Sequence, residues 1–287
     1  MSSVLQTIRN RMDSFSKGQK RIAAYILSDY DKAAFMTAAK LGKTAQVSES
    51  TVVRFATELG YGGYPAMQKA LQELIRGRLT SVQRIHASES TVEGTDILSS
   101  VMHRDMESIH GTIEQVDRGA FANVVEQLMQ AEHIYILGVR SSAFLAGYLN
   151  FYLHLIMDNV TLVQNSAAGE IYEQMVHIGP NDVLLAISFP RYSNMVIHAV
   201  DLAYERGAAV IAITDNTLSP LMPYATDSLF VRCEALAYVD SLAAPLSLLN
   251  ALVLAVGRRR KQEVADTFSQ LEQVWSKYDI FGKSEDE

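Results

Sequence analysis

Two short stretches place hydroxyl side chains where the chain should pass from a strand into a helix. The first is GVRSS at residues 138–142, and the second is SFPRYS at residues 188–193. The apolar runs before them predict buried strands, and the segments after them have helical periodicity. A helix N-terminus favours an anion, and hydroxyls beside it can hold a phosphate and sugar hydroxyls without a metal. The alternative is that these serines are only helix caps, which are common.

The elements around these stretches alternate regularly. Strands are predicted at residues 133–139, 160–163, 182–188, 208–214 and 227–231, and helices at 141–157, 169–177, 193–206 and 241–256. Short apolar strands alternating with helices predict an α/β domain whose mainly parallel sheet is covered on both faces. Ligands bind at the carboxyl ends of the strands in such sheets, and both hydroxyl stretches follow such an end.

The N-terminal part of the chain predicts two helices joined by a tight turn. The first covers residues 37–44, the turn is 45–47, and Ser48 is expected to cap the second helix by accepting from the N–H of Thr51. Val47 and Val52 have the spacing of a hydrophobic staple. Gly60 is expected to end the second helix, where a left-handed residue is favoured.

The outward face of this second helix carries small polar residues and one arginine. Ser50, Thr51 and Arg54 lie opposite the apolar positions, near the N-terminal end with Ser48. Such an arrangement is typical of a helix-turn-helix whose second helix enters the major groove of DNA. Arg can pair with guanine there, and Ser or Thr can serve several bases. An ordinary helical hairpin with a solvated face is the alternative.

Composition separates the chain into two halves of opposite charge. Residues 1–80 hold 12 Lys and Arg against 6 Asp and Glu, whereas residues 81–287 hold 13 against 26. A basic module attached to an acidic body is expected of a DNA-binding domain joined to a sensor. The single cysteine, Cys233, excludes an intramolecular disulfide and fits a reducing cytoplasm. The longest nearly apolar run, 242–256, is too short to span a bilayer.

The run VSESTVVRFATELGYGGYPAMQKAL resembles the DNA-binding domain of the RpiR (MurR/RpiR) family of bacterial transcriptional regulators. That family has a VS-x-x-TV-x-RF core followed by LG and an aromatic–Gly–aromatic turn. The matching positions are Val47, Ser48, Thr51, Val52, Arg54, Phe55, Leu59, Gly60, Tyr61, Gly63 and Tyr64. Gln46 departs from the family, which more often has Gly in this turn. Gln takes the left-handed conformation only at some cost.

The second half, over residues 120–258, resembles the SIS (sugar isomerase) domain, a phosphosugar-binding α/β module. The runs SFPRYS and AITDNTLSPL are similar to those of RpiR-type regulators. The resemblance implies that Ser141 and Ser142 contact the sugar. It also implies that Ser188, Tyr192 and Ser193 surround the phosphate, with Arg191 nearby. Isomerases of this fold often have S-x-S-G-x-T in the second loop, and Phe189-Pro190 replaces part of that motif here.

Signals for an enzyme or a cofactor are weak. G-x-G-x-x-G is missing after residue 139 and no P-loop motif is present, so no cofactor is expected. Aldose–ketose isomerisation needs a base, often with a Lys or His to open the ring, and no lysine lies between residues 70 and 260. Glu170, Glu173, His154 and His198 could act as bases but have no motif partner. No histidine spacing indicates a metal site.

These patterns predict a helix-turn-helix domain at residues 1–80, a linker and connecting helix at 81–119, an SIS domain at 120–258, and a C-terminal helix and tail at 259–287. The leading hypothesis is a cytoplasmic transcriptional regulator that binds a double-stranded DNA operator and a phosphorylated sugar, without a membrane partner. A homo-oligomer, dimer or tetramer, is expected because such proteins pair half-sites on DNA. The alternatives are a phosphosugar isomerase with an N-terminal extension, and a ligand-binding module that docks on protein.

Overall fold

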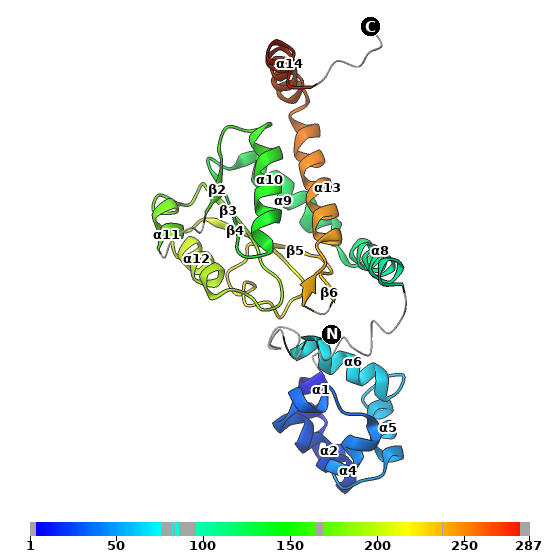
Figure 1. Cartoon of the computed structure of the whole chain (residues 1–287). Coiled ribbons are helices and arrows are strands. Elements are labelled where there is room, and N and C mark those ends of the chain that lie inside the picture. Colours follow the sequence, from blue (N-terminus) through cyan, green and yellow to red (C-terminus); the bar gives the residue numbers. More distant parts are fainter. Residues whose placement is uncertain are drawn as a thin grey trace. The chain divides into compact units, whose positions relative to one another are not determined.

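The chain forms two units, each with hydrophobic core residues of its own (Figure 1). The units are residues 1–91 and 92–287. The structure, a computed structural model, describes residues 4–75, 82, 84–85, 96–164, 169–236 and 238–281. Of the region predicted as linker and connecting helix, residues 81–95 lie outside the described residues apart from 82, 84 and 85.

In its described residues, the first unit contains helices and no strands. Its helices are α1 (Val4–Asn10), α2 (Lys17–Ser28), α3 (Tyr30–Ala33), α4 (Ala38–Thr44), α5 (Glu49–Glu58) and α6 (Tyr64–Ile75), with a 3₁₀ turn, η1 (Met12–Ser14). A capping box starts α2, because Ser16 accepts from the N–H of Gln19 and the Gln19 side chain accepts from the N–H of Ser16. Apolar side chains from these helices meet in one core, in which the rings of Phe15 and Phe55 pack edge to face at 5.0 Å.

The second unit is built on a five-stranded parallel sheet. Its strands are β1 (Ile134–Gly138), β2 (Val160–Val163), β3 (Val183–Ile187), β4 (Ala209–Thr214) and β5 (Asp227–Phe230). The order in space is β2-β1-β3-β4-β5, and Gly138 of β1 lies beside Ile187 of β3. The predicted α/β class with a parallel sheet is confirmed.

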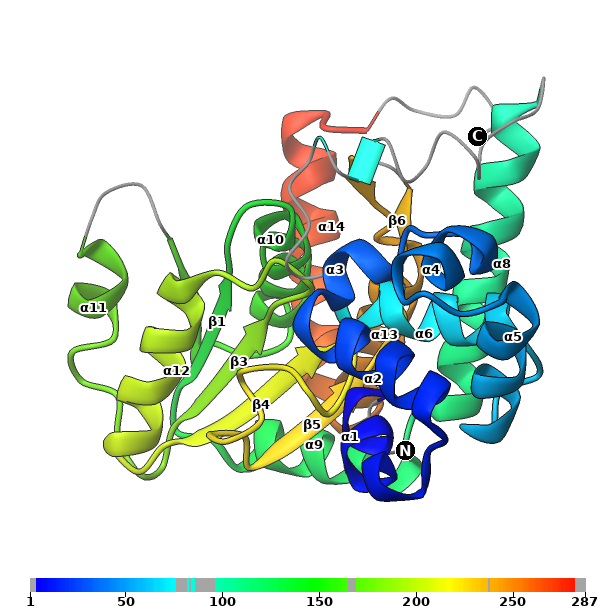
Figure 2. The ribbon, with the colours of Figure 1, turned by 90° about the horizontal axis from the view of Figure 1, so that it is seen from below.

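Helices cover both faces of this sheet (Figure 2). One face is covered by α9 (Arg118–Gln130), α10 (Ser142–His154) and α13 (Ala243–Arg259), and the other by α11 (Glu170–Gln174) and α12 (Asn194–Glu205). Successive strand residues point to opposite faces, so Ile136 joins the first core and Leu137 the second. Both faces of the sheet are covered here, which explains why β1 and β3 are hydrophobic and buried at every position.

Helix α8 (Ile97–Gln115) belongs to the second unit and packs against α13. The segment after β5 fastens it: the backbone N–H of Arg232 donates to Thr112 Oγ1 at 3.0 Å, and Ser241 Oγ donates to Asp105 Oδ1 at 2.5 Å. The same segment holds a short antiparallel pair that sequence patterns did not predict, β6 (Ala235–Leu236) and β7 (Val239–Asp240). The chain's last helix is α14 (Lys261–Tyr278).

Neither membrane spans nor metal clusters occur in the part of the chain that the structure describes. None of its helices is both long and apolar enough to cross a bilayer. No group of three or more His, Cys, Asp or Glu side chains in these ranges could hold a metal ion.

Candidate nucleic-acid interface and ligand site

Helices α4 and α5 form the predicted helix-turn-helix. Ser48 caps α5, since its side chain accepts from the backbone N–H of Thr51 at 3.3 Å. The chain passes between the helices through Gln46, whose φ of 56° is left-handed. The N–H of Val47 then donates to the carbonyl of Gly42 at 2.8 Å, which closes the turn.

Close packing of the backbone at this turn explains why residue 42 is a glycine. A Cβ atom there would lie 2.9 Å from the carbonyl oxygen of Val47, which is tighter than real contacts allow. Val52, Phe55 and Ala56 are fully buried, so one face of α5 is committed to the core. The opposite face is therefore the one available to a partner.

The outward face of α5 carries the residues that were predicted to touch DNA. Ser48, Ser50 and Arg54 are exposed, and Thr51 is half-buried. The hydroxyl of Ser48 lies 2.9 Å from that of Ser50 and 2.8 Å from that of Thr51, so the three hydroxyls form one cluster at the N-terminus of α5. The guanidinium of Arg54 makes no hydrogen bond or ion pair with any residue that the structure describes. Donors and acceptors of the kinds that read base edges and phosphates thus share one surface.

In the second unit, the strand order places the two hydroxyl stretches side by side. The chain leaves β1 toward β2 on one side and leaves β3 toward β4 on the other, so β1 and β3 border the topological switch point. Open parallel sheets bind ligands at this point, outside the carboxyl ends of the strands. Residues 138–142 and 188–193 are the loops at these ends. We call this region, with the start of the loop after β4, the carboxyl edge.

The loop after β1 turns sharply into α10. Arg140 is exposed and has a left-handed φ of 56°, and Ser141 follows it at the helix start. Ser141 is exposed and its side chain makes no capping hydrogen bond within the described chain, whereas Ser142 is buried. A Cβ atom on Gly138 would overlap the carbonyl oxygen of Ser142, so only glycine permits this approach of helix to strand.

The loop after β3 repeats the left-handed backbone. Arg191 is exposed with φ of 71°, and Ser188 is buried at the end of the strand. Ser193 is a helix cap, because its side chain accepts from the N–H of Met195 at 3.3 Å. Non-glycine residues are rare in this conformation, and such strained positions gather at functional sites. Two arginines held in this way at one edge therefore indicate a place for an anion.

Tyr192 connects this loop to the end of β4. Its hydroxyl donates to Asp215 Oδ1 at 2.6 Å, and Asn216 Nδ2 donates to the other carboxylate oxygen at 2.6 Å. Burial, and next the charge of Asp215, raise the pKa of the Tyr192 phenol far above its usual value, so this phenol stays a donor. The hydroxyls of Ser219 and Thr214 also bond to this phenol, so it is already engaged by the protein and holds the loop in place.

Sequence reasoning missed Arg140 and Asp215 as members of this edge. Arg140 stood inside the quoted loop, but nothing in the sequence shows that its backbone is left-handed. Asp215 follows β4, and only the strand order brings it to Tyr192. A cation inside the GVRSS loop was the sequence feature that could have marked Arg140 as a candidate anion ligand.

The acidic and histidine side chains considered as bases are scattered. His154 ends α10, so it lies at the far end of that helix from the carboxyl edge. His198 is exposed on α12. Glu170 and Glu173 begin α11, which follows β2, so they lie nearer this edge. Cys233 is buried, and its thiol donates to the carbonyl of Ser241 at 3.4 Å, which agrees with a structural thiol.

A helix-turn-helix unit joined to a parallel α/β unit with hydroxyl-rich loops at its carboxyl edge is the organisation of two-domain, ligand-controlled regulators. Two family models match the chain: the helix-turn-helix domain of the rpiR family covers residues 2–76, and the SIS domain covers residues 127–255. The chain thus combines an rpiR-type helix-turn-helix domain with an SIS domain, as in RpiR-type transcriptional regulators.

Two curated relatives align with most of the chain. The chain is 29% identical to the uncharacterized regulator YfhH of Escherichia coli, over 80% of this chain and 82% of that protein. It is 27% identical to the HTH-type transcriptional regulator HexR of Pseudomonas aeruginosa, over 75% of this chain and 74% of that one.

One solved structure aligns with nearly all of the chain. It is the Vibrio vulnificus NanR protein complexed with ManNAc-6P, which is 26% identical, covers 98% of this chain and 100% of its own, and gives a TM-score of 0.60. The sugar isomerase domain of an RpiR transcription factor from Sphaerobacter thermophilus gives a TM-score of 0.59 at 21% identity, over 62% of this chain and 99% of its own. That second likeness concerns the fold alone.

Proposed function

We propose that this protein is a transcriptional regulator that binds a DNA operator through the outward face of α5 and a phosphorylated sugar at the carboxyl edge. The observation that supports the sensor most is the pairing of two left-handed arginines, Arg140 and Arg191, at the switch point of the sheet. Their guanidinium groups suit bidentate contact with phosphate. The hydroxyls of Ser141, Ser142, Ser188 and Ser193 would serve the phosphate and the sugar, and Tyr192 would position the loop through Asp215.

On the DNA side, we assign base or phosphate contacts to Ser48, Ser50, Thr51 and Arg54. The hydroxyl cluster lies at the N-terminus of α5, where helix-turn-helix proteins contact base edges. Arg54 extends from the next turn of the same helix, within reach of a neighbouring base pair. Binding of chromosomal DNA would also place the protein in the cytoplasm.

Regulation is proposed without turnover of the ligand. An isomerase needs a base beside the bound sugar, and Arg140, Arg191, the serines and Tyr192 include no side chain that is a free base near neutral pH. The carboxylates that could overturn this assignment are Asp215, which accepts from Tyr192 and Asn216 at this edge, and Glu170 and Glu173 of α11. Conversion of an aldose phosphate to its ketose by the purified protein, lost in Glu170→Gln or Glu173→Gln, would establish an enzyme instead.

The proposal is tested by measuring phosphosugar binding and DNA binding on the same preparation of the protein. Phosphosugars are first screened by thermal shift, because a ligand that binds the native state raises its stability. N-acetylmannosamine 6-phosphate is the first compound to try, since the NanR relative is complexed with it. Fluorescence anisotropy with DNA from the region upstream of the protein's own gene is then recorded with and without the best ligand. A ligand that binds without changing DNA affinity would contradict a regulatory role.

A further inference from the structure

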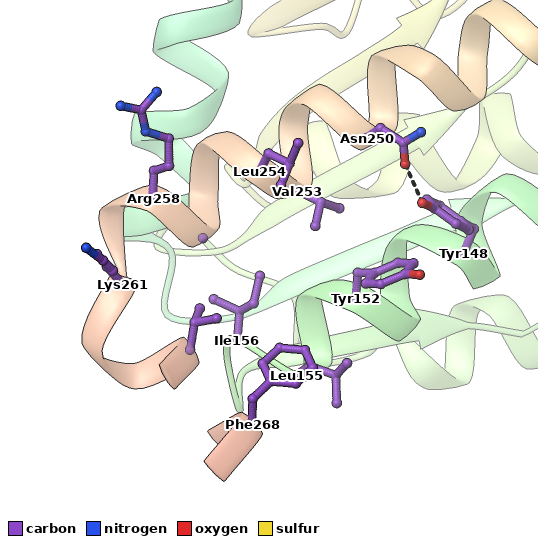
Figure 3. A pocket seen from close by; sticks show the side chains of 12 residues that line it. Tyr148, Tyr152, Leu155, Ile156, Asn250, Val253, Leu254, Arg258, Lys261 and Phe268 are labelled. Atoms are coloured by element: carbon purple, nitrogen blue, oxygen red, sulfur yellow. Dashed lines mark hydrogen bonds between the residues drawn. The ribbon is translucent and has the colours of Figure 1, made fainter. Parts of the chain in front are cut away.

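Exposed apolar side chains have different surroundings in the two units. In the second unit they gather, because Tyr152, Leu254 and Phe268 line one groove of about 890 Å³ between α10, α13 and α14 (Figure 3). In the first unit Val53 of α5, which is 40% exposed, lies among polar side chains. A single exposed apolar residue needs no covering partner. Its role therefore depends on the face that it occupies.

Val53 lies on the outward part of α5, among the residues assigned to DNA. Helical spacing places it three residues after Ser50 and next to Arg54, and both of these neighbours are exposed as well. One turn earlier on the same row is Glu49, also exposed. Phosphates repel a carboxylate, so a row that begins with Glu49 suits base edges better than the phosphate backbone.

Local stability does not explain a valine at this position. Valine is a weaker helix former than alanine or leucine, because a helix restricts its χ1 angle. The same restriction holds its two methyl groups in one strongly preferred orientation, so little freedom is lost when they meet a partner. In the major groove the apolar group that a methyl can contact is the 5-methyl of thymine.

We propose that Val53 contacts the 5-methyl group of a thymine in the operator and is a specificity-determining residue of this interface. Cytosine carries only hydrogen at the same ring position, so this contact favours thymine over cytosine. Ser50 and Arg54 supply polar contacts beside it, and none of their donors or acceptors detects a methyl group. The inference rests on the proposed function, since it requires that α5 enters the major groove.

The test uses the full-length protein and the tightest-binding duplex selected from a random-sequence DNA library. Each thymine of that duplex is replaced in turn by deoxyuridine, which removes only the 5-methyl group, and fluorescence anisotropy measures the dissociation constant. At one thymine position or more, the replacement should weaken wild-type binding by about 3- to 10-fold, the effect expected from burial of a methyl group.

Variants of Val53 connect this loss to one side chain. Val53→Ala should weaken binding to the thymine duplex by a similar factor, with little further loss when deoxyuridine stands at the sensitive position, because the two changes remove the same contact. Val53→Thr, which has the same shape and keeps one methyl group, should lie between wild type and Val53→Ala.

The matched control is Phe35→Ala, because Phe35 is an equally exposed apolar residue outside α4 and α5. This variant should keep the full sensitivity to deoxyuridine. Urea unfolding of each variant checks that its fold is kept. Specific binding in which every deoxyuridine affects wild type and Val53→Ala equally would overturn the inference and leave the proposed function standing. A library that yields no specifically bound duplex would overturn the proposed function, and this inference with it.

Discussion

The turn of the helix-turn-helix and the turns of the carboxyl edge share a left-handed backbone conformation but use different residues for it. Each turn places a non-glycine residue in the left-handed region: Gln46 between α4 and α5, Arg140 after β1, and Arg191 after β3. Glycine would take this conformation at lower cost. In the first turn the chain keeps a neutral amide, while at the carboxyl edge it keeps two cations. The difference indicates that the edge retains its strained residues for their side chains, whereas the helical turn needs only the backbone.

The largest expected effect comes from the glycine that lets α10 approach β1. Gly138→Ala should lower the free energy of unfolding of the second unit by about 2–3 kcal/mol, because the new Cβ would collide with backbone of Ser142. The control is Gly147→Ala on α10, where the added Cβ would have no atom within 4 Å. This change should leave the free energy of unfolding the same or raise it. Urea unfolding compares the two. Equal stability of both variants would mean that the edge turn is looser than described.

Alanine substitution of one arginine in each region should separate the two proposed binding activities. Arg191→Ala should weaken phosphosugar binding by about 1.5–3 kcal/mol, the cost of a hydrogen bond to a charged group, and leave DNA affinity without ligand unchanged. Arg54→Ala should weaken operator binding by about 1–3 kcal/mol and leave sugar affinity unchanged. Isothermal titration and anisotropy measure the two affinities. If Arg54 contacts phosphate only, all DNA sequences should be affected evenly and the salt dependence should decrease.

Two serines distinguish helix caps from ligand contacts. Ser193→Ala should lower stability by about 1 kcal/mol, because this hydroxyl caps α12. Ser141→Ala should leave stability unchanged within about 0.5 kcal/mol, since an exposed residue without a capping bond contributes little. Thermal melts measure both, and titration with the best phosphosugar shows which variant loses affinity. Intact sugar binding in both would remove these two hydroxyls from the site and leave the arginines with Ser142 and Ser188.

The smallest expected effect is on stability and comes from Gln46, whose backbone is left-handed. Gln46→Gly should raise the stability of the first unit by about 0.5 kcal/mol, because relief of the left-handed strain slightly exceeds the greater entropy lost by glycine on folding. Operator affinity should stay the same. Denaturant unfolding together with anisotropy tests this, and a loss of DNA binding would show that Gln46 itself faces the operator.

Periodicity and capping signals predicted most elements closely. The strand at 160–163 was placed with the observed bounds, because its apolar run stands between polar residues. The C-terminal helix predicted within 259–287 corresponds to α14. Helix α3, with four residues of mixed polarity, and the β6–β7 pair, with two residues in each strand, were missed because neither contains an apolar run long enough to stand out. Ser48 was identified as a cap from its type and position alone, and the structure confirms that role.

The candidate site was only partly accessible to such reasoning. Hydroxyl-rich loops after two strands are visible in the sequence, but the order of strands in space is not. That order, β2-β1-β3-β4-β5, is what makes the two loops neighbours and brings Asp215 to Tyr192. Backbone conformation at Arg140 likewise depends on how α10 packs on β1, a tertiary contact without a local signal.

The single thiol of the chain makes both units accessible to spectroscopy. Cys233 is buried and hydrogen-bonded, so a maleimide dye should react with it far more slowly than with an exposed thiol. One cysteine introduced at an exposed position such as Thr57 and another at Tyr204 would then carry a donor and an acceptor fluorophore without removal of the native thiol. Energy transfer between them could report, molecule by molecule, whether the phosphosugar changes the distance between the two units.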